Sequence, residues 1–293
     1  MGIAPVSRKG IGAILSAEFA GGLDVARGIV KKTGMGADPA ESASVSSLYR
    51  YPVKGLSGER LASVALAPGA TFPMDRAYAL ENGPSGFDPE APTWQPKIKF
   101  LCLMRNASIA ALTTRYDDAS GMLSVSQGGS LLLEARLTDD VGRAAVETFF
   151  QKFMGSGARG SIRVLQSPGH SFSDVAKKVV SIINLESVAA VGETIDRDVH
   201  PLRFRGNLHV AGWPAWFETQ LVGRELEIGT TRLRVVKMIQ RCAATEVNPE
   251  TAERDIAVPE ELYRLTGEDD CGIYAEVTTA GTIAEGDSIR ILG

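Results

Sequence analysis

Short alternating runs of apolar and polar residues dominate the chain from residue 45 onward, a pattern typical of β-strands. Turn signals such as Pro68-Gly69, Asn82-Gly83 and Gly286-Asp287 separate the runs. An Asp-Asp-Ala-Ser-Gly turn joins two strands within 108–129. The expected strands lie within 44–50, 59–67, 76–82, 108–127, 207–212, 225–239, 272–280 and 287–292.

Three segments follow the helical period instead. Residues 139–155 carry apolar positions on one face, with Asp139 or Asp140 as the cap, and 184–195 form a second helix capped by Asn184. Near the start, Ile11 to Val30 predicts an amphipathic helix, followed by a linker rich in Gly, Ala, Ser and Pro that ends near Ser44. The face expected to be buried in 139–155 comprises Val141, Ala145, Val146, Phe149, Phe150 and Phe153. The pattern predicts an α+β protein, predominantly β, with a closed or nearly closed β-barrel and small inserted helices.

Composition and charge narrow the class of protein. The chain has 293 residues and a formal net charge of −4, which argues against a nucleic-acid-binding protein held by overall charge. We find neither a stretch long and apolar enough to span a membrane nor a secretory signal, so we expect a cytoplasmic protein. The three cysteines lie far apart, which argues against a disulfide framework, a zinc ribbon or an iron–sulfur site.

Cys242 is the most informative of these cysteines. It follows the apolar run 235–239 and Arg241, and it precedes the turn at Asn248-Pro249. A neighbouring guanidinium would lower the pKa of the thiol, and a thiolate is a soft metal ligand. A half-buried structural cysteine is the other interpretation, and the local sequence leaves both open.

Four blocks of sequence resemble the MOSC family, named after the C-terminal domain of molybdenum cofactor sulfurases. They are LYRYPVKGLSGE, RFRGNLHV, QRCAATEVNPET and GIYAEVTTAGTIAEGDSIRIL, in that order. The chain is most similar to the two-domain branch that includes the mitochondrial amidoxime-reducing component and its bacterial relatives. The resemblance implies an N-terminal helix and linker in 1–44, a MOSC N-terminal β-barrel domain in 45–153 and a MOSC domain in 154–293.

The resemblance also implies a molybdenum cofactor site. Cys242 matches the cysteine that completes the coordination of molybdenum. Lys54, Arg76, Arg205 and Asn207 match the residues that anchor the pterin and its phosphate, and guanidinium and ammonium groups suit that anion. Arg241 and Thr245 flank Cys242 and are further candidates.

Two glycines depart from the family pattern. Gly55 replaces the usual serine, which leaves its backbone N–H to serve as donor, and Gly206 replaces a proline, which should loosen the loop.

Other polar residues are weaker candidates. His209 could move protons at the metal or simply be a hydrogen-bonded strand residue, and Asp196 or Asp198 could orient Arg203 or Arg205. Thr245 could form a hydrogen bond within its turn or reach the cofactor. Asn248, followed by Pro249, is typical of a turn. Ser181 and Asn184 could line the pocket. The residues expected on the surface are His170, His200, Arg50, Arg60 and Arg264, and those expected in the core or at strand ends are Cys102 and Cys271.

The resemblance favours a molybdenum-dependent oxidoreductase that removes oxygen from N-hydroxylated small molecules such as amidoximes. A non-catalytic cofactor carrier and a sulfur-transfer protein that forms a persulfide on Cys242 are the alternatives. The sequence has no ferredoxin-type cysteine cluster, haem motif or dinucleotide fingerprint, so an enzyme would need a separate ferredoxin or cytochrome with its reductase. It also has no pyridoxal-phosphate domain, so Lys54 is not expected to form a Schiff base.

Overall fold

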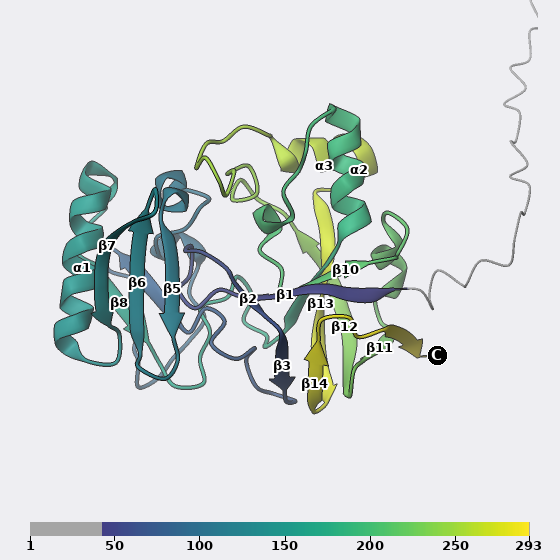
Figure 1. Ribbon diagram of the computed structural model, residues 1–293, viewed down its shortest axis with the longest axis horizontal. Helices are drawn as coiled ribbons and strands as arrows, with labels where there is room; N and C mark the ends of the chain where they lie inside the picture. The colour runs from purple at the N-terminus through teal and green to yellow at the C-terminus, as the bar shows by residue number, and fades with distance from the viewer. Residues whose placement is uncertain (1–42, 293) are drawn as a thin grey trace, which may run out of the picture. The chain divides into compact units, whose positions relative to one another are not determined.

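A computed structural model describes residues 43–292 of the chain (Figure 1). The helix expected in 11–30 lies outside the described residues, as does almost all of the linker before Ser44. Strands dominate, with three α-helices among the described residues. The predicted class, predominantly β with inserted helices, is therefore confirmed.

An eight-stranded sheet forms the C-terminal half of the molecule (Figure 1). Its order is β15 (Ile289–Leu292), β11 (Glu225–Ile228), β12 (Thr231–Gln240), β13 (Asp270–Thr279), β9 (Val180–Asn184), β10 (Leu208–Ala211), β1 (Ser44–Arg50) and β2 (Glu59–Leu61). All neighbours pair antiparallel except β9 and β10, which are parallel. A short ladder joins β3 (Ser63–Leu66) to β14 (Gly281–Ala284). Strands from the beginning of the chain thus complete a sheet built mainly from its end.

Alternation of buried and exposed residues along the strands gives this sheet one apolar face, which packs around a single core. In β12 and β11, every second residue turns inward, as Leu226, Leu233 and Val235 show. Trp213 is fully buried in the same cluster, together with Leu48 from β1. The strand β9 is buried along its whole length, so its five residues show no alternation. That strand was not predicted from the sequence.

A second core lies in the N-terminal half, under α1 (Asp140–Met154). This helix packs on β7 (Ser130–Arg136) and β8 (Ile162–Gln166), which belong to two small sheets. The sheets comprise β5 (Thr113–Asp117), β6 (Met122–Gln127) and β7, and β4 (Tyr78–Asn82) with β8. The sequence predicted β4, β5 and β6, but it did not predict β7 or β8.

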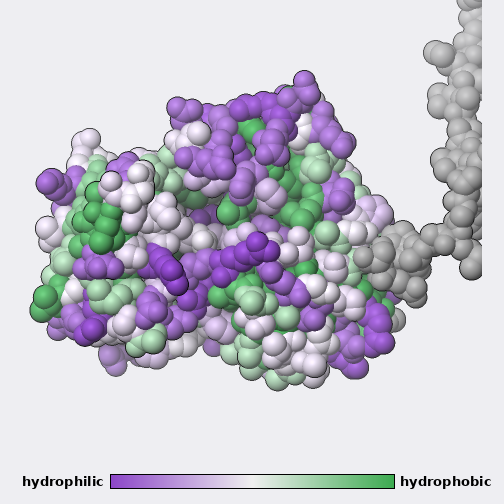
Figure 2. Space-filling view, viewed as in Figure 1, coloured by the Kyte–Doolittle hydropathy of each residue, from purple (hydrophilic) through white to green (hydrophobic). Residues whose placement is uncertain are grey.

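The cap of α1 is as expected, but its buried face is not. Asp139 accepts a hydrogen bond from the backbone N–H of Gly142 at 2.7 Å. Val146 and Phe150 are buried, whereas Val141 is 81% exposed and Ala145 is exposed as well. The expected face was therefore wrong at its N-terminal end, where Gly142 instead lies against the backbone of Arg136. Figure 2 shows an apolar patch over the β7 side of this half, and Leu131 and Leu132 of β7 are exposed.

Two further α-helices cover the C-terminal sheet (Figure 1). Asn184 caps α2 (Leu185–Ile195) as predicted, and α3 (Val258–Thr266), which was not predicted, packs against it. Short 3₁₀ helices complete the chain: η1 (Lys97–Lys99), η2 (Ala107–Ala111), η3 (Gly155–Gly157), η4 (Pro201–Phe204) and η5 (Phe217–Leu221). Within residues 43–292, none of the helices is long and apolar enough to cross a membrane.

Candidate active site

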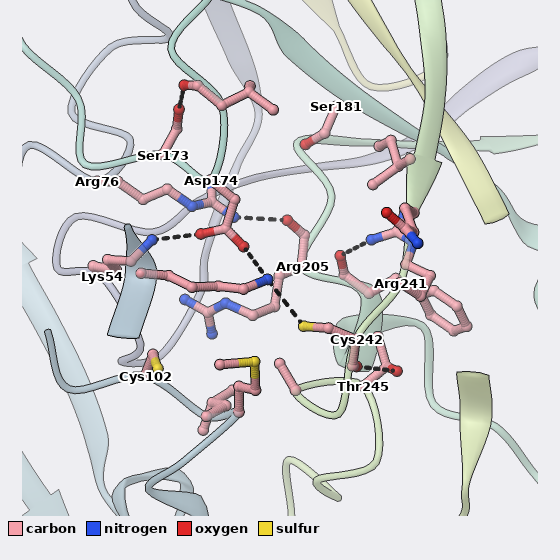
Figure 3. A pocket seen from close by; sticks show the side chains of 18 of the residues that line it. Lys54, Arg76, Cys102, Ser173, Asp174, Ser181, Arg205, Arg241, Cys242 and Thr245 are labelled. Atoms are coloured by element: carbon pink, nitrogen blue, oxygen red, sulfur yellow. Dashed lines mark hydrogen bonds and ion pairs between the residues drawn. The ribbon is translucent and has the colours of Figure 1, made fainter. Parts of the chain in front are cut away.

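One pocket collects the main candidates for the cofactor site (Figure 3). Its volume is about 300 Å³, and its walls come from the turn after β1, from η1, from the loop before β9, from η4 and from the end of β12. The predicted residues that line it are Lys54, Gly55, Arg76, Arg205, Asn207, Arg241, Cys242 and Thr245. The roles of these residues stay predictions, but their convergence from distant parts of the chain is a structural fact.

Cys242 lies half-buried in this pocket at the end of a chain of charged contacts. The Nζ atom of Lys97 lies 3.2 Å from Cys242 Sγ and 3.3 Å from the carboxylate of Asp174. The same carboxylate accepts a 2.5 Å hydrogen bond from Nζ of Lys54 (Figure 3). The sequence analysis missed both Lys97 and Asp174, because they lie 145 residues from Cys242 and 120 residues from Lys54, respectively.

The pKa values in this chain of contacts follow from burial and charge. Burial lowers the pKa of Lys54, and Asp174 offsets only part of that effect. For Lys97, burial is outweighed by Asp174 and Cys242, so its pKa is raised and its ammonium form is favoured. For Asp174, burial is outweighed by Lys54 and Lys97, which hold its pKa well below the usual range. The group is thus a fixed set of charges that lies next to a thiol.

The guanidinium of Arg241 is held by backbone carbonyls. Its Nε donates to the carbonyl of Cys271 at 2.7 Å, and its Nη1 donates to the carbonyl of Phe204 at 2.9 Å. Figure 3 shows the guanidinium turned away from the thiol. The cation beside Cys242 Sγ is Lys97. The effect of Arg241 on the thiol stays a prediction, since backbone carbonyls hold its guanidinium while Lys97 makes the close contact with the sulfur.

Arg76 and Arg205 form the opposite wall. Both guanidinium groups lie over the ring of Tyr51, at 4.9 and 4.1 Å from its centroid. Arg76 is paired with Asp75 and donates to the carbonyl of Arg205 at 3.1 Å. Arg205 donates one hydrogen bond, to the carbonyl of Leu56 at 2.8 Å, and its buried Nη2 has no partner within residues 43–292. Burial and the nearby Arg76 lower the pKa of Arg205 to about 10, which leaves it charged at neutral pH.

Asn207 is buried and largely committed to the fold. Its Oδ1 accepts from the hydroxyl of Ser181 at 2.7 Å, and its Nδ2 donates to the carbonyl of Tyr49 at 3.2 Å. One amide hydrogen therefore remains for a ligand. Ser181 lines the same pocket, whereas Asn184 does not, because it caps α2 and bonds Glu218 at 2.8 Å.

Two glycines close to the site are required by their neighbours. Gly55 has φ +84°, and a Cβ there would lie 2.8 Å from the carbonyl of Leu101. A Cβ on Gly206 would collide with Cγ1 of Ile183. Close packing, rather than a loose loop, accounts for Gly206.

The structure changes the expectation for each of the three histidines. Neither His170 nor His200 is fully exposed: His170 packs against Phe87 and Phe172, and Nδ1 of His200 accepts from the N–H of Leu202 at 3.1 Å. His209 is buried against Tyr49 and does not line the pocket, and its Nε2 has no partner among the described residues. It is thus neither placed for proton transfer at Cys242 nor hydrogen-bonded through Nε2.

The acidic partner of Arg203 was also misassigned. Asp196 and Asp198 are exposed, and Asp255 pairs with Arg203 at 2.7 Å instead. Arg50 is also largely covered, paired with Glu59 and Asp118, whereas Arg60 and Arg264 are exposed as expected.

The remaining assignments agree with the sequence. Thr245 donates to the carbonyl of Cys242 at 2.9 Å, and Asn248 accepts from the N–H of Glu250 at 2.9 Å, so both close turns. Cys271 is fully buried, and Cys102 is buried where it meets the pocket wall. Both fit the expected core and strand-end roles.

The charges of the pocket select anions. Seven cationic side chains line it, against the two carboxylates of Asp75 and Asp174. Within residues 43–292, no three His, Cys, Asp or Glu side chains group closely enough to hold a metal ion. The protein alone thus offers a thiol, an excess of positive charge and a hydrogen-bond donor without a partner.

Comparison with known proteins identifies the family. A model of the MOSC domain matches residues 138–290, and a model of the MOSC N-terminal beta barrel domain matches residues 42–161. The chain belongs to the MOSC family. MOSC domains are associated with molybdenum cofactor binding or with sulfurase-like proteins. No curated protein matches the chain.

Solved structures resemble this MOSC protein only distantly. The YUAD protein from Bacillus subtilis has a TM-score of 0.40 and 13% identity, covering 85% of this chain and 94% of that one. YiiM from Geobacillus stearothermophilus has a TM-score of 0.32 and 18% identity, covering 39% of this chain and 54% of that one. YiiM from Escherichia coli has a TM-score of 0.29 and 16% identity, with the same coverage. The family assignment rests on the two domain matches and not on these structures.

Proposed function

We propose that this MOSC protein is a molybdenum-cofactor-dependent oxidoreductase that removes oxygen from N-hydroxylated small molecules. The observation that carries the proposal is a half-buried thiol, Cys242, in a pocket whose charges select a large anion. A thiolate is a soft ligand, and soft ligands suit a metal that sulfur already holds. Because Cys242 offers one such ligand, the others would come from a bound group.

The residues present fit that group. The molybdenum cofactor is a pterin that carries a dithiolene and a phosphate, so it needs donors and positive charge. Arg205 supplies a buried Nη2 with no partner among the described residues, which is costly unless a ligand accepts from it. Lys54 and Asn207 each retain a hydrogen for a further bond.

The chain's own residues would then do three things. Cys242 would hold the metal, while Lys54, Arg76, Arg205 and Asn207 would anchor the anion. The Lys97 ammonium lies 3.2 Å from Cys242 Sγ, where it can hold a proton beside the reacting centre. When bound, the cofactor would supply the two-electron chemistry of oxygen transfer.

Electrons would come from outside the chain. Cys102 and Cys271 are buried and isolated, and neither belongs to a cluster within residues 43–292. We therefore propose a separate donor, a small ferredoxin or cytochrome with its reductase. The cofactor-loaded chain should reduce an amidoxime with reduced viologen but not with NADH alone. NADH-driven turnover by the single chain would contradict the need for a donor, and silence with viologen across several N-hydroxylated substrates would favour a cofactor carrier.

A paired substitution tests the anchor. Arg205→Ala removes a buried contact to an anion worth about 1.5–3 kcal/mol, so it should lower cofactor retention after gel filtration roughly tenfold or more. Arg60→Ala is the matched control, since Arg60 is 61% exposed and pairs only with Glu285 on the surface. Equal cofactor content in the two variants would remove Arg205 from the anchor.

A further inference from the structure

A second cavity opens from the Cys242 pocket toward Trp94. Its volume is about 390 Å³, within the range of small-molecule sites. Four of its lining residues, Val175, Val179, Lys237 and Tyr274, also line the Cys242 pocket. The two cavities therefore adjoin each other, and we call the second one the vestibule.

The walls of the vestibule have the chemistry of an aromatic-ring site. Trp94 is 43% exposed although it is a large aromatic residue, and Tyr274 belongs to the same lining. The valines 175, 179 and 236 add apolar surface between these rings. Planar rings stack on indole and phenol faces, and burial of their apolar area adds to that attraction.

One cation in the vestibule is available to a ligand. Nζ of Lys237 lies 5.7 Å from the centroid of the Tyr274 ring. Within residues 43–292, no carboxylate lies close enough to Lys237 to form an ion pair, whereas Lys177 is paired with Glu276 at 3.0 Å. Lys237 can therefore pair with an anionic group held above Tyr274.

The segment that carries Trp94 leads directly to the thiol. Gln95 and Pro96 separate Trp94 from η1, whose first residue, Lys97, contacts Cys242 Sγ. The same short segment therefore contributes Trp94 to the vestibule and Lys97 to the Cys242 pocket. Such an arrangement places the far end of a substrate while its reactive group enters the inner pocket.

We propose that the vestibule binds the aromatic part of the substrate, through Trp94 and Tyr274, and an anionic substituent on it, through Lys237. The selected class is therefore aromatic N-hydroxylated compounds that carry a carboxylate. The reaction part of this inference rests on the proposed function, but the binding part does not.

Binding is tested on the full-length, cofactor-free chain with 2-naphthoate as the probe, by calorimetry. Trp94→Ala should raise Kd about 10-fold, and Trp94→Phe should recover most of the loss. Lys237→Gln should raise Kd for 2-naphthoate about fivefold but leave the neutral 2-naphthamide unchanged. Lys152→Gln is the matched control, because Lys152 is exposed on α1 and lines neither the vestibule nor the Cys242 pocket. Equal affinity in wild type, Trp94→Ala and Lys237→Gln, or no binding at all, would overturn the proposal.

Two further measurements separate this inference from its competitors. Cofactor-loaded protein should bind 2-naphthoate within about twofold of the cofactor-free Kd; lost binding would assign the vestibule to the cofactor and overturn the proposal. In viologen-driven turnover, the ratio of kcat/KM for 4-carboxybenzamidoxime to that for hydroxylamine should fall about fivefold or more in Trp94→Ala. Probe binding without any turnover would refute the proposed function and leave the binding site standing. Turnover with an unchanged ratio would refute the vestibule's role.

Discussion

One cysteine follows the end of β12 and another lies at the start of β13, and the two have opposite environments. Cys242 and Cys271 lie near one pair of the ladder, Gln240 and Asp270. Cys271 is fully buried between the sheet and its two helices, and burial raises the pKa of its thiol to about 12. Cys242 is half-buried beside a lysine in an anion-selecting pocket. The same residue type is thus sealed in the core at one place and half-buried in a pocket at the other.

Each cysteine also contacts a different cationic residue. Proximity in sequence does not predict which cation lies beside which cysteine. Arg241 follows Gln240 in the chain, yet it donates to the carbonyl of Cys271. Lys97 comes from the other half of the molecule and lies beside Cys242. Both residues line the pocket, but backbone carbonyls hold the guanidinium of Arg241, whereas the thiol of Cys242 contacts a lysine from a distant part of the chain.

The largest expected effect concerns the reactivity of the two thiols. At pH 8 a thiol with a pKa of about 12 is ionised in roughly one molecule in 10⁴, and Cys271 is also sealed from solvent. Iodoacetamide should therefore label Cys242 on the order of 1,000 times faster than Cys271 in the cofactor-free native protein. Peptide mass spectrometry after timed quenching measures both rates. Comparable labelling rates would contradict the view that the two thiols have opposite environments.

A pair of substitutions separates the two cations. Arg241→Met leaves the buried carbonyls of Cys271 and Phe204 without donors and should cost about 4 kcal/mol of unfolding free energy. Lys97→Met should cost about 1 kcal/mol or less, because Lys97 is part-exposed and Asp174 keeps Lys54. Urea unfolding measures both. Similar losses of unfolding free energy in the two variants would contradict the view that Arg241 stabilises the fold while Lys97 serves the site.

His209 is a further buried titratable residue. It lies on β10, which is the second strand from β13 in the sheet. Burial lowers the pKa of His209 to about 4, from an ordinary value of 6.5. Between these values the unfolded chain binds more protons than the folded one, so stability should fall as pH falls from 6.5 to 4, by about 3 kcal/mol. His209→Phe keeps an aromatic contact to Tyr49 and should remove this part of the pH dependence. Denaturation curves at several pH values, compared with wild type, decide the matter; an unchanged slope in the variant would exclude His209.

The sequence indicates the helix caps, whereas it does not indicate the contacts between distant residues. Asp139 and Asn184 predict the starts of α1 and α2 correctly, because a helix cap involves only neighbouring residues. The strand β9 was not predicted because it is buried on both faces, so its sequence does not alternate between apolar and polar residues. The pairs Lys97–Cys242 and Lys54–Asp174 are set by the approach of the two halves of the fold, which no local pattern encodes. Family resemblance indicated Cys242 and the candidate anchors of the pocket, but it did not indicate Lys97 or Asp174.

The central claim is that Cys242 holds the molybdenum of a bound cofactor. The most direct measurement is elemental analysis of the full chain purified from a host that makes the cofactor, followed by X-ray absorption at the molybdenum edge. The account predicts about one molybdenum atom per chain, and one fewer sulfur neighbour in Cys242→Ser, because a hydroxyl is a harder and poorer ligand than a thiolate. Protein without molybdenum, or a sulfur count that the substitution leaves unchanged, would contradict it.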